Sequence, residues 1–242
     1  MQQTQQHSRP ADFESWWNQQ GEWVEAPNQR RDGNSGVQRL AASDGSLLYL
    51  KRQTGHLSRS LRHPFGRPTV VREARALDAY RAAGVKVPGT VFAGARQQQG
   101  TWQGLLVTEA LRGFVSLDEW YASNAASQYG AAVHRHMLRE LAATLGLAHA
   151  QGLQHGCLYS KHVFIRLRSQ GVEIALLDLE KSRRRWRKSA AVRHDLTQLY
   201  RHRGAMPESD WFQMLEDYRK VAVIAPSERL LGRKTPIRPK QA

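Results

Sequence analysis

Hydrophobic and polar residues alternate along much of the first half of the chain, in short runs separated by glycine-containing turns. Three strand-like runs cover residues 22–25, 37–41 and 46–52, and the segments "DGNSG" and "SDGS" predict turns between them. Alternation with a period of two and short turns is typical of an antiparallel meander. The segments "GTVFAG" and "TWQGLLVTEAL" add two more strands, so the sequence predicts an antiparallel sheet up to about residue 108.

Two segments of this first half show helical spacing instead. Asp12 is the expected N-cap of a short helix with three aromatic residues on one face. The segment "PTVVREARALDAYRAAG" predicts a longer helix that has Thr69 as its N-cap and ends at Gly84. The sequence therefore predicts one long helix beside the sheet.

The second half of the chain is mainly helical. The segments "AAVHRHMLRELAATLGLAHAQG" and "DWFQMLEDYRKVAVIA" repeat apolar residues at helical spacing. The exception is a predicted hairpin of "HVFIRL" and "VEIALLD". We expect an α+β fold with a sheet-rich lobe over residues 12–108 and a helical lobe over 109–222. The polar, basic segments 1–11 and 223–242 are predicted to be flexible tails.

Composition narrows the class of partner. The chain has 242 residues, enough for one domain or two lobes, and a formal net charge of +15. Such a charge predicts a polyanionic partner: a nucleic acid, an anionic membrane face or a phosphorylated substrate. A single Cys excludes an internal disulfide and favours a reducing, cytoplasmic location. No secretory signal and no long apolar run is present, so any membrane contact is expected to be peripheral.

Lys51 and Glu73 are the first pair of residues that suggest chemistry. Lys51 lies within or at the end of an apolar strand, where its charge needs a partner if it is buried. Glu73 shares a helical stripe with Leu77 and Tyr80, and such a stripe is expected to face the protein body. In kinases a strand Lys and a helix Glu form the ion pair that holds the α- and β-phosphates of ATP. The alternative is an exposed Lys and a solvated Glu.

Two further residues occur in the order that a kinase requires. Asp178 follows the apolar strand of "IALLDLE", where a carboxylate can hold a metal ion on nucleotide phosphates, although a simple turn Asp is the alternative. His155 begins the loop "HGCLYSKH", which follows the long second-half helix, and is a candidate catalytic residue. Gly33 and Gly36 lie between two predicted strands and could cradle phosphate, but they lack the three-glycine spacing of protein kinases and equally fit a plain hairpin turn.

A basic stretch, "EKSRRRWRKSAAVRH", follows Asp178. It predicts a positive patch that suits phosphate groups or an anionic membrane surface, with Trp at the headgroup boundary. A solvated basic face and a nonspecific nucleic-acid surface remain alternatives, although no nucleic-acid-binding motif is present. The predicted patch comprises Arg183, Arg184, Arg185, Trp186, Arg187 and Lys188, together with Arg62 and Arg67 from "RSLRHPFGRP".

The chain resembles the bacterial lipopolysaccharide kinase family, whose members phosphorylate Kdo or heptose in the lipopolysaccharide inner core. The resemblance extends from about Trp16 to Leu199. It is carried by "WWNQQGEWVEAPNQRRDGNSGVQ", "LYLKRQ", "HPFGRPTVVREARAL", "LLVTEAL", "QHGCLYSKH" and "LLDLEKSRRR". It implies a bilobal protein-kinase-like fold, ATP with Mg²⁺ or Mn²⁺, and a cytoplasmic protein at the inner face of the envelope.

The resemblance also implies roles for individual residues. Lys51 and Glu73 would form the nucleotide ion pair, and Asp178 would bind the metal. Asp195 in "RHDL" would support the catalytic loop from below. The strand end of "LLVTEAL", with Thr108, Glu109 and Ala110, would contribute to the nucleotide site.

The loop departs from the family pattern at two positions. Cys157 stands where active members carry an Asp, and His162 stands where most kinases carry a metal-binding Asn; His at that position also occurs in the heptose kinase branch. A thiol accepts a hydroxyl proton poorly, yet a missing general base typically costs only roughly 10² to 10⁴ in rate. Glu180 is the nearest carboxylate that could substitute, unless it is a plain surface residue. A phosphocysteine at Cys157 is the least favoured interpretation.

Three functions therefore stay open at this point. The first is a slow ATP-dependent kinase that acts on a lipopolysaccharide core-like sugar. The second is a pseudokinase that binds a nucleotide or a partner, for example as a stress-linked regulator, without turnover. The third is a basic nucleic-acid-binding protein.

Overall fold

The structure is a computed structural model that describes residues 12–30, 33–42, 44–55, 57–60 and 63–223. It divides into two compact units, one of Met1–Leu77 with Pro88–Ala110 and one of Asp78–Val87 with Leu111–Ala242. The segment 78–87, predicted with the first lobe, thus falls in the second unit. The predicted tails lie outside the described residues, except for Val223. No helix in the described ranges has both the length and the apolar character needed to span a bilayer.

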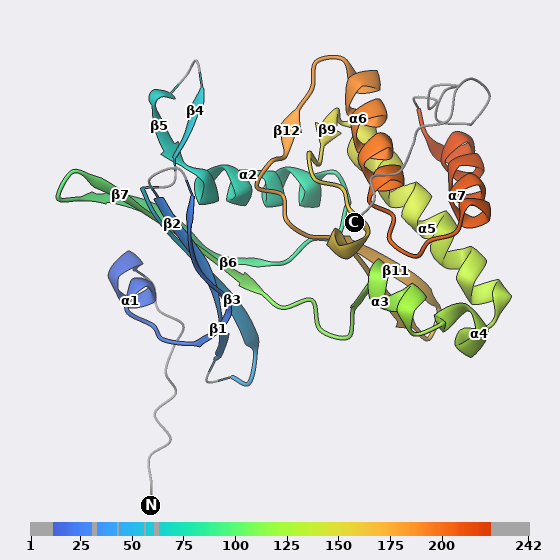
Figure 1. The fold of residues 1–242 in the computed structure, drawn as a ribbon, viewed down its shortest axis with the longest axis horizontal. Coiled ribbons are helices and arrows are strands. Elements are labelled where there is room, and N and C mark those ends of the chain that lie inside the picture. The colour runs from blue at the N-terminus through green and yellow to red at the C-terminus, as the bar shows by residue number, and fades with distance from the viewer. Residues whose placement is uncertain (1–11, 31–32, 43, 56, 61–62, 224–242) are drawn as a thin grey trace, which may run out of the picture. The chain divides into compact units, whose positions relative to one another are not determined.

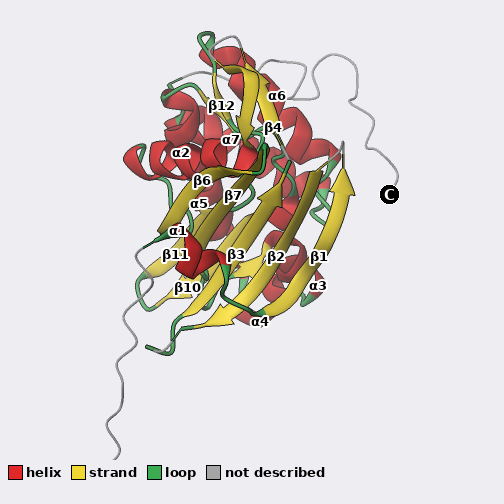
Figure 2. Ribbon diagram, turned by 90° about the vertical axis from the view of Figure 1, so that its left-hand side faces the viewer, coloured by secondary structure: helices red, strands yellow, loops and turns green. Residues whose placement is uncertain are grey.

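The first unit is built on a five-stranded antiparallel sheet with strand order β1-β2-β3-β7-β6 (Figure 2). A separate hairpin, β4–β5, and two helices complete it. The strands are β1 (Glu22–Arg30), β2 (Gly33–Ala41), β3 (Leu47–Thr54), β4 (Leu57–Ser60), β5 (His63–Pro68), β6 (Thr90–Gln98) and β7 (Thr101–Glu109), and the helices are α1 (Phe13–Trp17) and α2 (Thr69–Ala82).

Alternation along β3 gives this sheet two different faces. Leu48 and Leu50 are buried in a cluster with Trp16 of α1. Lys51 and Gln53 are on the opposite face, because successive side chains of a strand point to opposite sides. Helix α2 covers this second face through its contacts with Lys51 and Gln53. The short aromatic helix and the long helix are therefore on opposite sides of one strand.

Gln53 anchors the start of α2. Its side-chain oxygen accepts hydrogen bonds from the Val70 N–H (3.0 Å) and the Thr69 hydroxyl (2.8 Å). Thr69 was predicted as the N-cap, but its hydroxyl acts as a donor and Gln53 supplies the capping acceptor. The paired strand β7 carries Gly104 opposite Gln53, and a Cβ there would lie 2.6 Å from Val70 Cγ2. The missing side chain allows α2 to approach the sheet closely.

The second unit is mainly helical, with α5 in contact with α6, α7 and β11 (Figure 1). Leu141 and Leu145 of α5 are fully buried, as are Met214 and Tyr218 of α7. The helices are α3 (Leu117–Ala122), α4 (Ala125–Tyr129), α5 (Ala131–Ala150), η1 (Ser160–His162), α6 (Lys188–Arg201) and α7 (Glu208–Val221). The strands are β8 (Val115–Ser116), β9 (Leu153–Gln154), β10 (Val163–Arg168), β11 (Gly171–Leu176) and β12 (Arg183–Arg184).

Two predictions about loops and ends were wrong. Gly33 and Gly36 were placed in a turn, but both lie inside β2, which begins at Gly33. A Cβ at Gly36 would lie 2.7 Å from Trp23 Cζ3, so this glycine accommodates the irregular, bulged pairing of β1. The last helix ends at Val221, whereas the sequence pattern continued to residue 225.

Candidate functional site

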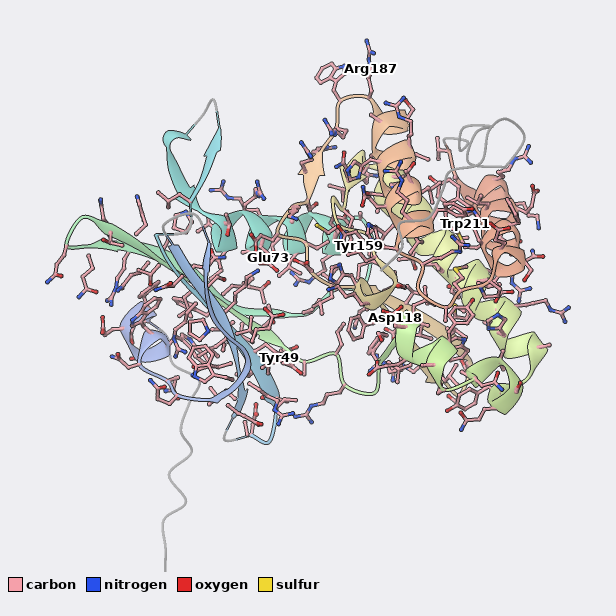
Figure 3. All side chains as sticks on the ribbon, viewed as in Figure 1. Tyr49, Glu73, Asp118, Tyr159, Arg187 and Trp211 are labelled. Carbon is pink, nitrogen blue, oxygen red and sulfur yellow. The ribbon has the colours of Figure 1, made fainter. Side chains whose placement is uncertain are left out.

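The predicted ion pair of the first unit is present. Lys51 Nζ lies 2.8 Å from Glu73 Oε2, and the two side chains are 18% and 11% exposed. Figure 3 shows Glu73 on α2. At this degree of burial a lone charge would be costly, so each side chain stabilises the charged form of the other. The exposed Lys and solvated Glu of the alternative interpretation are excluded.

The positions of this pair follow from the repeats of the strand and the helix. Two strand residues span about 6.7 Å and four helix residues about 6 Å. Gln53 meets Thr69 and Val70, and Lys51, two residues earlier on the same face, therefore meets Glu73, four residues after Thr69. The Gln53 cap sets the register in which the ion pair forms.

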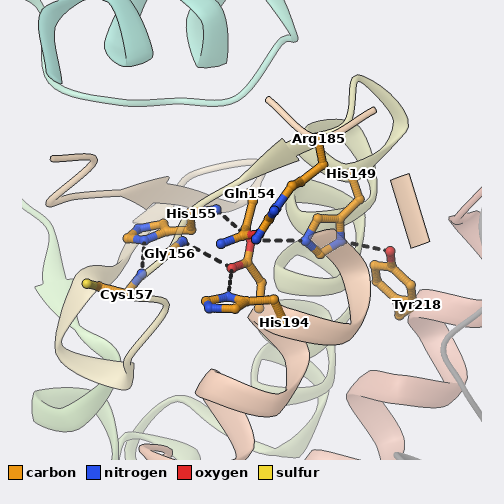
Figure 4. Close-up of polar contacts among 9 residues, drawn as sticks. His149, Gln154, His155, Gly156, Cys157, Arg185, His194 and Tyr218 are labelled. Carbon is orange, nitrogen blue, oxygen red and sulfur yellow. Dashed lines mark hydrogen bonds and ion pairs between the residues drawn. The ribbon is translucent and has the colours of Figure 1, made fainter. Parts of the chain in front are cut away.

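In the second unit, the side chain of Asp195 in α6 binds backbone N–H groups of the loop that follows β9. Its Oδ2 accepts from the His155 N–H at 2.6 Å, and its Oδ1 accepts from the Gly156 N–H at 3.1 Å (Figure 4). Gly156 has φ +89°, and a Cβ there would lie 2.5 Å from the Lys181 carbonyl oxygen. Asp195 therefore holds the loop through two backbone N–H groups, and the loop requires a glycine at position 156.

Two histidines complete the hydrogen bonds of Asp195. His194 Nδ1 donates to Oδ1 at 3.0 Å, and His149 Nε2 donates to Oδ2 at 3.4 Å. His149 Nδ1 in turn accepts from the Tyr218 hydroxyl at 2.8 Å. Burial alone would raise the pKa of Asp195, but the hydrogen bonds from the two histidines hold this pKa well below its usual range. The carboxylate is thus ionised and fully satisfied in the interior.

The buried side chain of His155 links two segments of the loop region by hydrogen bonds. Its Nε2 donates to the Leu177 carbonyl at 3.0 Å, and its Nδ1 accepts from the Cys157 N–H at 3.3 Å. Burial lowers the pKa of His155 to about 4, so the ring is neutral at pH 7. Because its side chain is 1% exposed, the geometry favours a positioning role over the predicted catalytic one.

Asp178 and His162 face each other. Asp178 Oδ2 lies 3.5 Å from His162 Nε2, and His162 Nδ1 donates to the Cys157 carbonyl at 2.7 Å. This second bond fixes a tautomer whose Nε2 carries a lone pair. The Asp178 carboxylate and this imidazole lone pair are both groups that can bind a cation. Asp178 also has φ +62°, an uncommon conformation for a residue with a side chain, which is typical of functional sites.

Cys157 is buried beside charged groups. Burial raises the pKa of its thiol, and the nearby Lys181 ammonium offsets only part of this increase. The thiol is therefore protonated at neutral pH and is not a base. The charge of Glu180 also raises the pKa of Cys157, but its effect is the smallest among the causes of this shift.

The strand end predicted to help hold a nucleotide lies at the end of β7. Thr108 and Glu109 are its last two residues, and Ala110 follows. The Glu109 N–H donates to the Gly89 carbonyl at 2.8 Å, and the Ala110 N–H donates to the Leu47 carbonyl at 2.9 Å. These two N–H groups are already engaged in backbone bonds, so other groups of this segment would have to contact a ligand.

Most of the predicted basic patch is exposed. Arg183, Arg184, Trp186, Arg187 and Lys188 are all exposed. The exception is Arg185, which is partly buried and whose Nε donates to Gln154 Oε1 at 2.6 Å. Of the other two residues predicted for the patch, Arg62 lies outside the described residues, and only the backbone of Arg67 is described, in β5.

A five-stranded antiparallel sheet with one long helix, followed by a helical unit with a hairpin after its central loop, is the arrangement of protein-kinase-like phosphotransferases. A model of the lipopolysaccharide kinase (Kdo/WaaP) family matches residues 14–218. The chain belongs to this family, and the resemblance inferred from its motifs is confirmed.

Two individual proteins show how far the similarity extends. The chain is 44% identical to Protein InaA of Escherichia coli (strain K12) over 207 residues, which are 86% of this chain and 95% of that protein. A solved structure, "WaaP in complex with acyl carrier protein", matches with a TM-score of 0.64 and 20% identity, covering 86% of this chain and 81% of that chain. At this identity the structural match shows the fold alone, and the predicted kinase-like fold is confirmed.

Sequence reasoning missed several residues that build these sites. Gln53 and Gly104 seat α2, and His149 with Tyr218 supports Asp195. Gln53 had a detectable signal, because it follows Lys51 on the same face of the strand. His149 had none, since its partners Asp195 and Tyr218 are remote along the chain.

Proposed function

We propose that this protein is an ATP-dependent phosphotransferase that phosphorylates a sugar hydroxyl of an anionic, lipopolysaccharide core-like acceptor. The observation that carries the proposal is the Lys51–Glu73 ion pair, in a chain that belongs to a lipopolysaccharide kinase family. In this role the amine of Lys51 contacts the α- and β-phosphates, while Glu73 holds it in place.

Asp178 and His162 fit a divalent cation shared with the phosphates. They offer one carboxylate oxygen and one imidazole lone pair, 3.5 Å apart. Mg²⁺ is commonly bound by few side chains together with substrate phosphates and water. The cation would neutralise charge that develops on the transferred phosphoryl group.

The protonated thiol of Cys157 makes the proposed reaction slow. It occupies the loop position at which a carboxylate would accept the acceptor proton, and burial raises its pKa. Phosphoryl transfer passes through a loose transition state in which positioning and charge neutralisation dominate. Turnover therefore continues without that base, at a rate reduced by roughly 10² to 10⁴.

The same cysteine favours a second candidate function. A pseudokinase would keep the ion pair, Asp178 and the bonds of Asp195 to the loop backbone, yet would bind nucleotide without transfer. The buried thiol is the specific observation in its favour. A nucleic-acid-binding function has no comparable support in the described residues.

Product formation separates these candidates. The protein is incubated with ATP, Mg²⁺ or Mn²⁺ and de-acylated core oligosaccharide, and phosphorylated sugar is measured by mass spectrometry. We expect slow product formation that Asp178→Asn abolishes, with the folded state retained because the Asp178 side chain is 40% exposed and lies outside the helices and strands. An ATP-induced rise in Tm without product would support the pseudokinase instead.

A further inference from the structure

The segment between β12 and α6 presents a fully exposed tryptophan. Trp186 is 100% exposed, more than any other large hydrophobic residue of the described chain. We call residues 182–188 the Arg–Trp tip. In Figure 1 the connection from β12 to α6 projects away from the helices, and Figure 3 shows Arg187 at its outer end. Exposing an indole to water forgoes a substantial burial free energy, so this placement needs an explanation.

The charges of the tip are not neutralised by the protein. Arg183, Arg184, Arg187 and Lys188 are exposed, and in the described ranges none of their side chains has an ion pair or a hydrogen bond. No acidic residue occurs between Lys181 and Arg193. Four cations thus flank one apolar side chain, and within the described residues none of them has an ion-pair partner.

The base of the tip is held firmly. Arg183 and Arg184 pair with Gln154 and Leu153 of β9. The Arg185 N–H donates to the Gly152 carbonyl at 2.7 Å, and Arg185 Nε donates to buried Gln154. These hydrogen bonds to residues 152–154 therefore hold the base of the tip in place.

We propose that the Arg–Trp tip docks on an anionic phospholipid bilayer. Indole rings prefer the headgroup boundary, and basic residues are attracted to anionic leaflets. The four cations and the indole lie within residues 183–188, which run from β12 to the first residue of α6, and this arrangement suits a flat surface better than a small ligand that needs convergent groups. A single aromatic residue also lacks the succession of stacking platforms that single-stranded nucleic acids require.

Strand β9, to which the base of the tip is bonded, connects the tip to the loop of the proposed active site. Strand β9 pairs with β12 and leads directly into His155 and Cys157. A docked tip would therefore hold this loop close to the lipid surface, where a glycolipid acceptor is found. This biological meaning rests on the proposed function, but docking itself requires neither ATP nor turnover.

Co-sedimentation with vesicles tests the proposal. The full chain, without ATP, is mixed with vesicles of phosphatidylcholine alone or with phosphatidylglycerol. We expect binding only to the anionic vesicles. The triple substitution Arg184→Gln, Arg187→Gln and Lys188→Gln should lower the partition coefficient roughly a hundredfold, since each basic residue contributes roughly fivefold. These side chains lack internal partners in the described structure, so Tm should not change.

A matched control removes the same charge elsewhere on the second unit. Arg135, Arg139 and Arg201 are also exposed and also lack side-chain partners in the described ranges. Their triple change to Gln should lower binding severalfold at most. Equal losses from both triples would show that net charge alone drives binding, and would overturn the proposal.

Brominated lipids report which indole enters the bilayer. They should quench the fluorescence of the protein, and Trp186→Phe should remove most of this quenching. Trp23→Phe, which changes another exposed indole, should leave it intact. The proposal would be refuted if the quenching persisted in Trp186→Phe. It would also be refuted if the protein bound an oligonucleotide through the tip and did not bind vesicles. Because Asp178→Asn should bind vesicles normally, failure of docking and failure of the kinase function can be distinguished.

Discussion

The two candidate regions are held in opposite ways. In the first unit, the Lys51–Glu73 pair depends on two side chains, and each needs the other. In the second unit, Asp195 holds the loop through the N–H groups of His155 and Gly156. Backbone bonds do not depend on the identity of the neighbouring side chain. The difference explains how a cysteine can occupy position 157 in an intact loop.

The largest expected effect comes from removing the support of the loop. Asp195→Ala leaves the N–H groups of His155 and Gly156 and two histidines without their shared acceptor, and we expect a loss of about 3–5 kcal/mol in the free energy of unfolding. Urea denaturation measures this change. Asp217→Ala is a matched control, because Asp217 is also buried but bonds Lys220 and Gln213 at the edge of α7. A loss equal to that of the control would mean that the loop is held by other contacts.

The pH dependence of stability should come next in size. Burial depresses the pKa of His155 to about 4, so the unfolded state binds this proton more tightly than the folded state. The neutral ring makes its full contribution to the free energy of unfolding above about pH 6.5. This contribution, up to about 3 kcal/mol, is lost as the pH falls towards 4. His155→Gln should flatten the unfolding free energy across this window. An unchanged slope in the variant would show that other groups titrate there.

The side-chain pair of the first unit should give the smallest change. Lys51→Met leaves Glu73 partly buried without its amine, and we expect a loss of about 1–2 kcal/mol in the free energy of unfolding. Lys51→Met with Glu73→Leu should cost less than the sum of the single changes. Lys86→Met, which breaks a longer and more exposed pair with Glu173, should cost less than about 0.5 kcal/mol. Additive effects at Lys51 and Glu73 would show that the pair is not coupled.

Much of the fold could be predicted because its signals are local. Alternation placed the central strands, and helical spacing placed α2 and α5. Lys51 and Glu73 could be paired from sequence because they match the strand Lys and the helix Glu of kinase architecture. The ion pair at 2.8 Å is the geometric outcome of that local pattern.

The remaining features depend on contacts that one sequence does not display. Gly33 and Gly36 looked like turn residues, yet Gly36 is needed for the approach of Trp23 from the neighbouring strand. The Tyr218–His149–Asp195 connection joins α5 to α6 and α7, and its two bonds link residues that are remote along the chain. Such contacts leave no periodic pattern in the sequence, because they are produced by tertiary packing.

The rate of phosphoryl transfer by Cys157→Asp shows whether the loop is intact and lacks only its base. A new carboxylate would lie beside the Lys181 ammonium, in a loop that Asp195 already holds. We expect a rate increase of roughly 10² to 10⁴ over the natural protein, with Cys157→Ser showing no increase. A folded, ATP-binding Cys157→Asp variant that transfers phosphate no faster would contradict it.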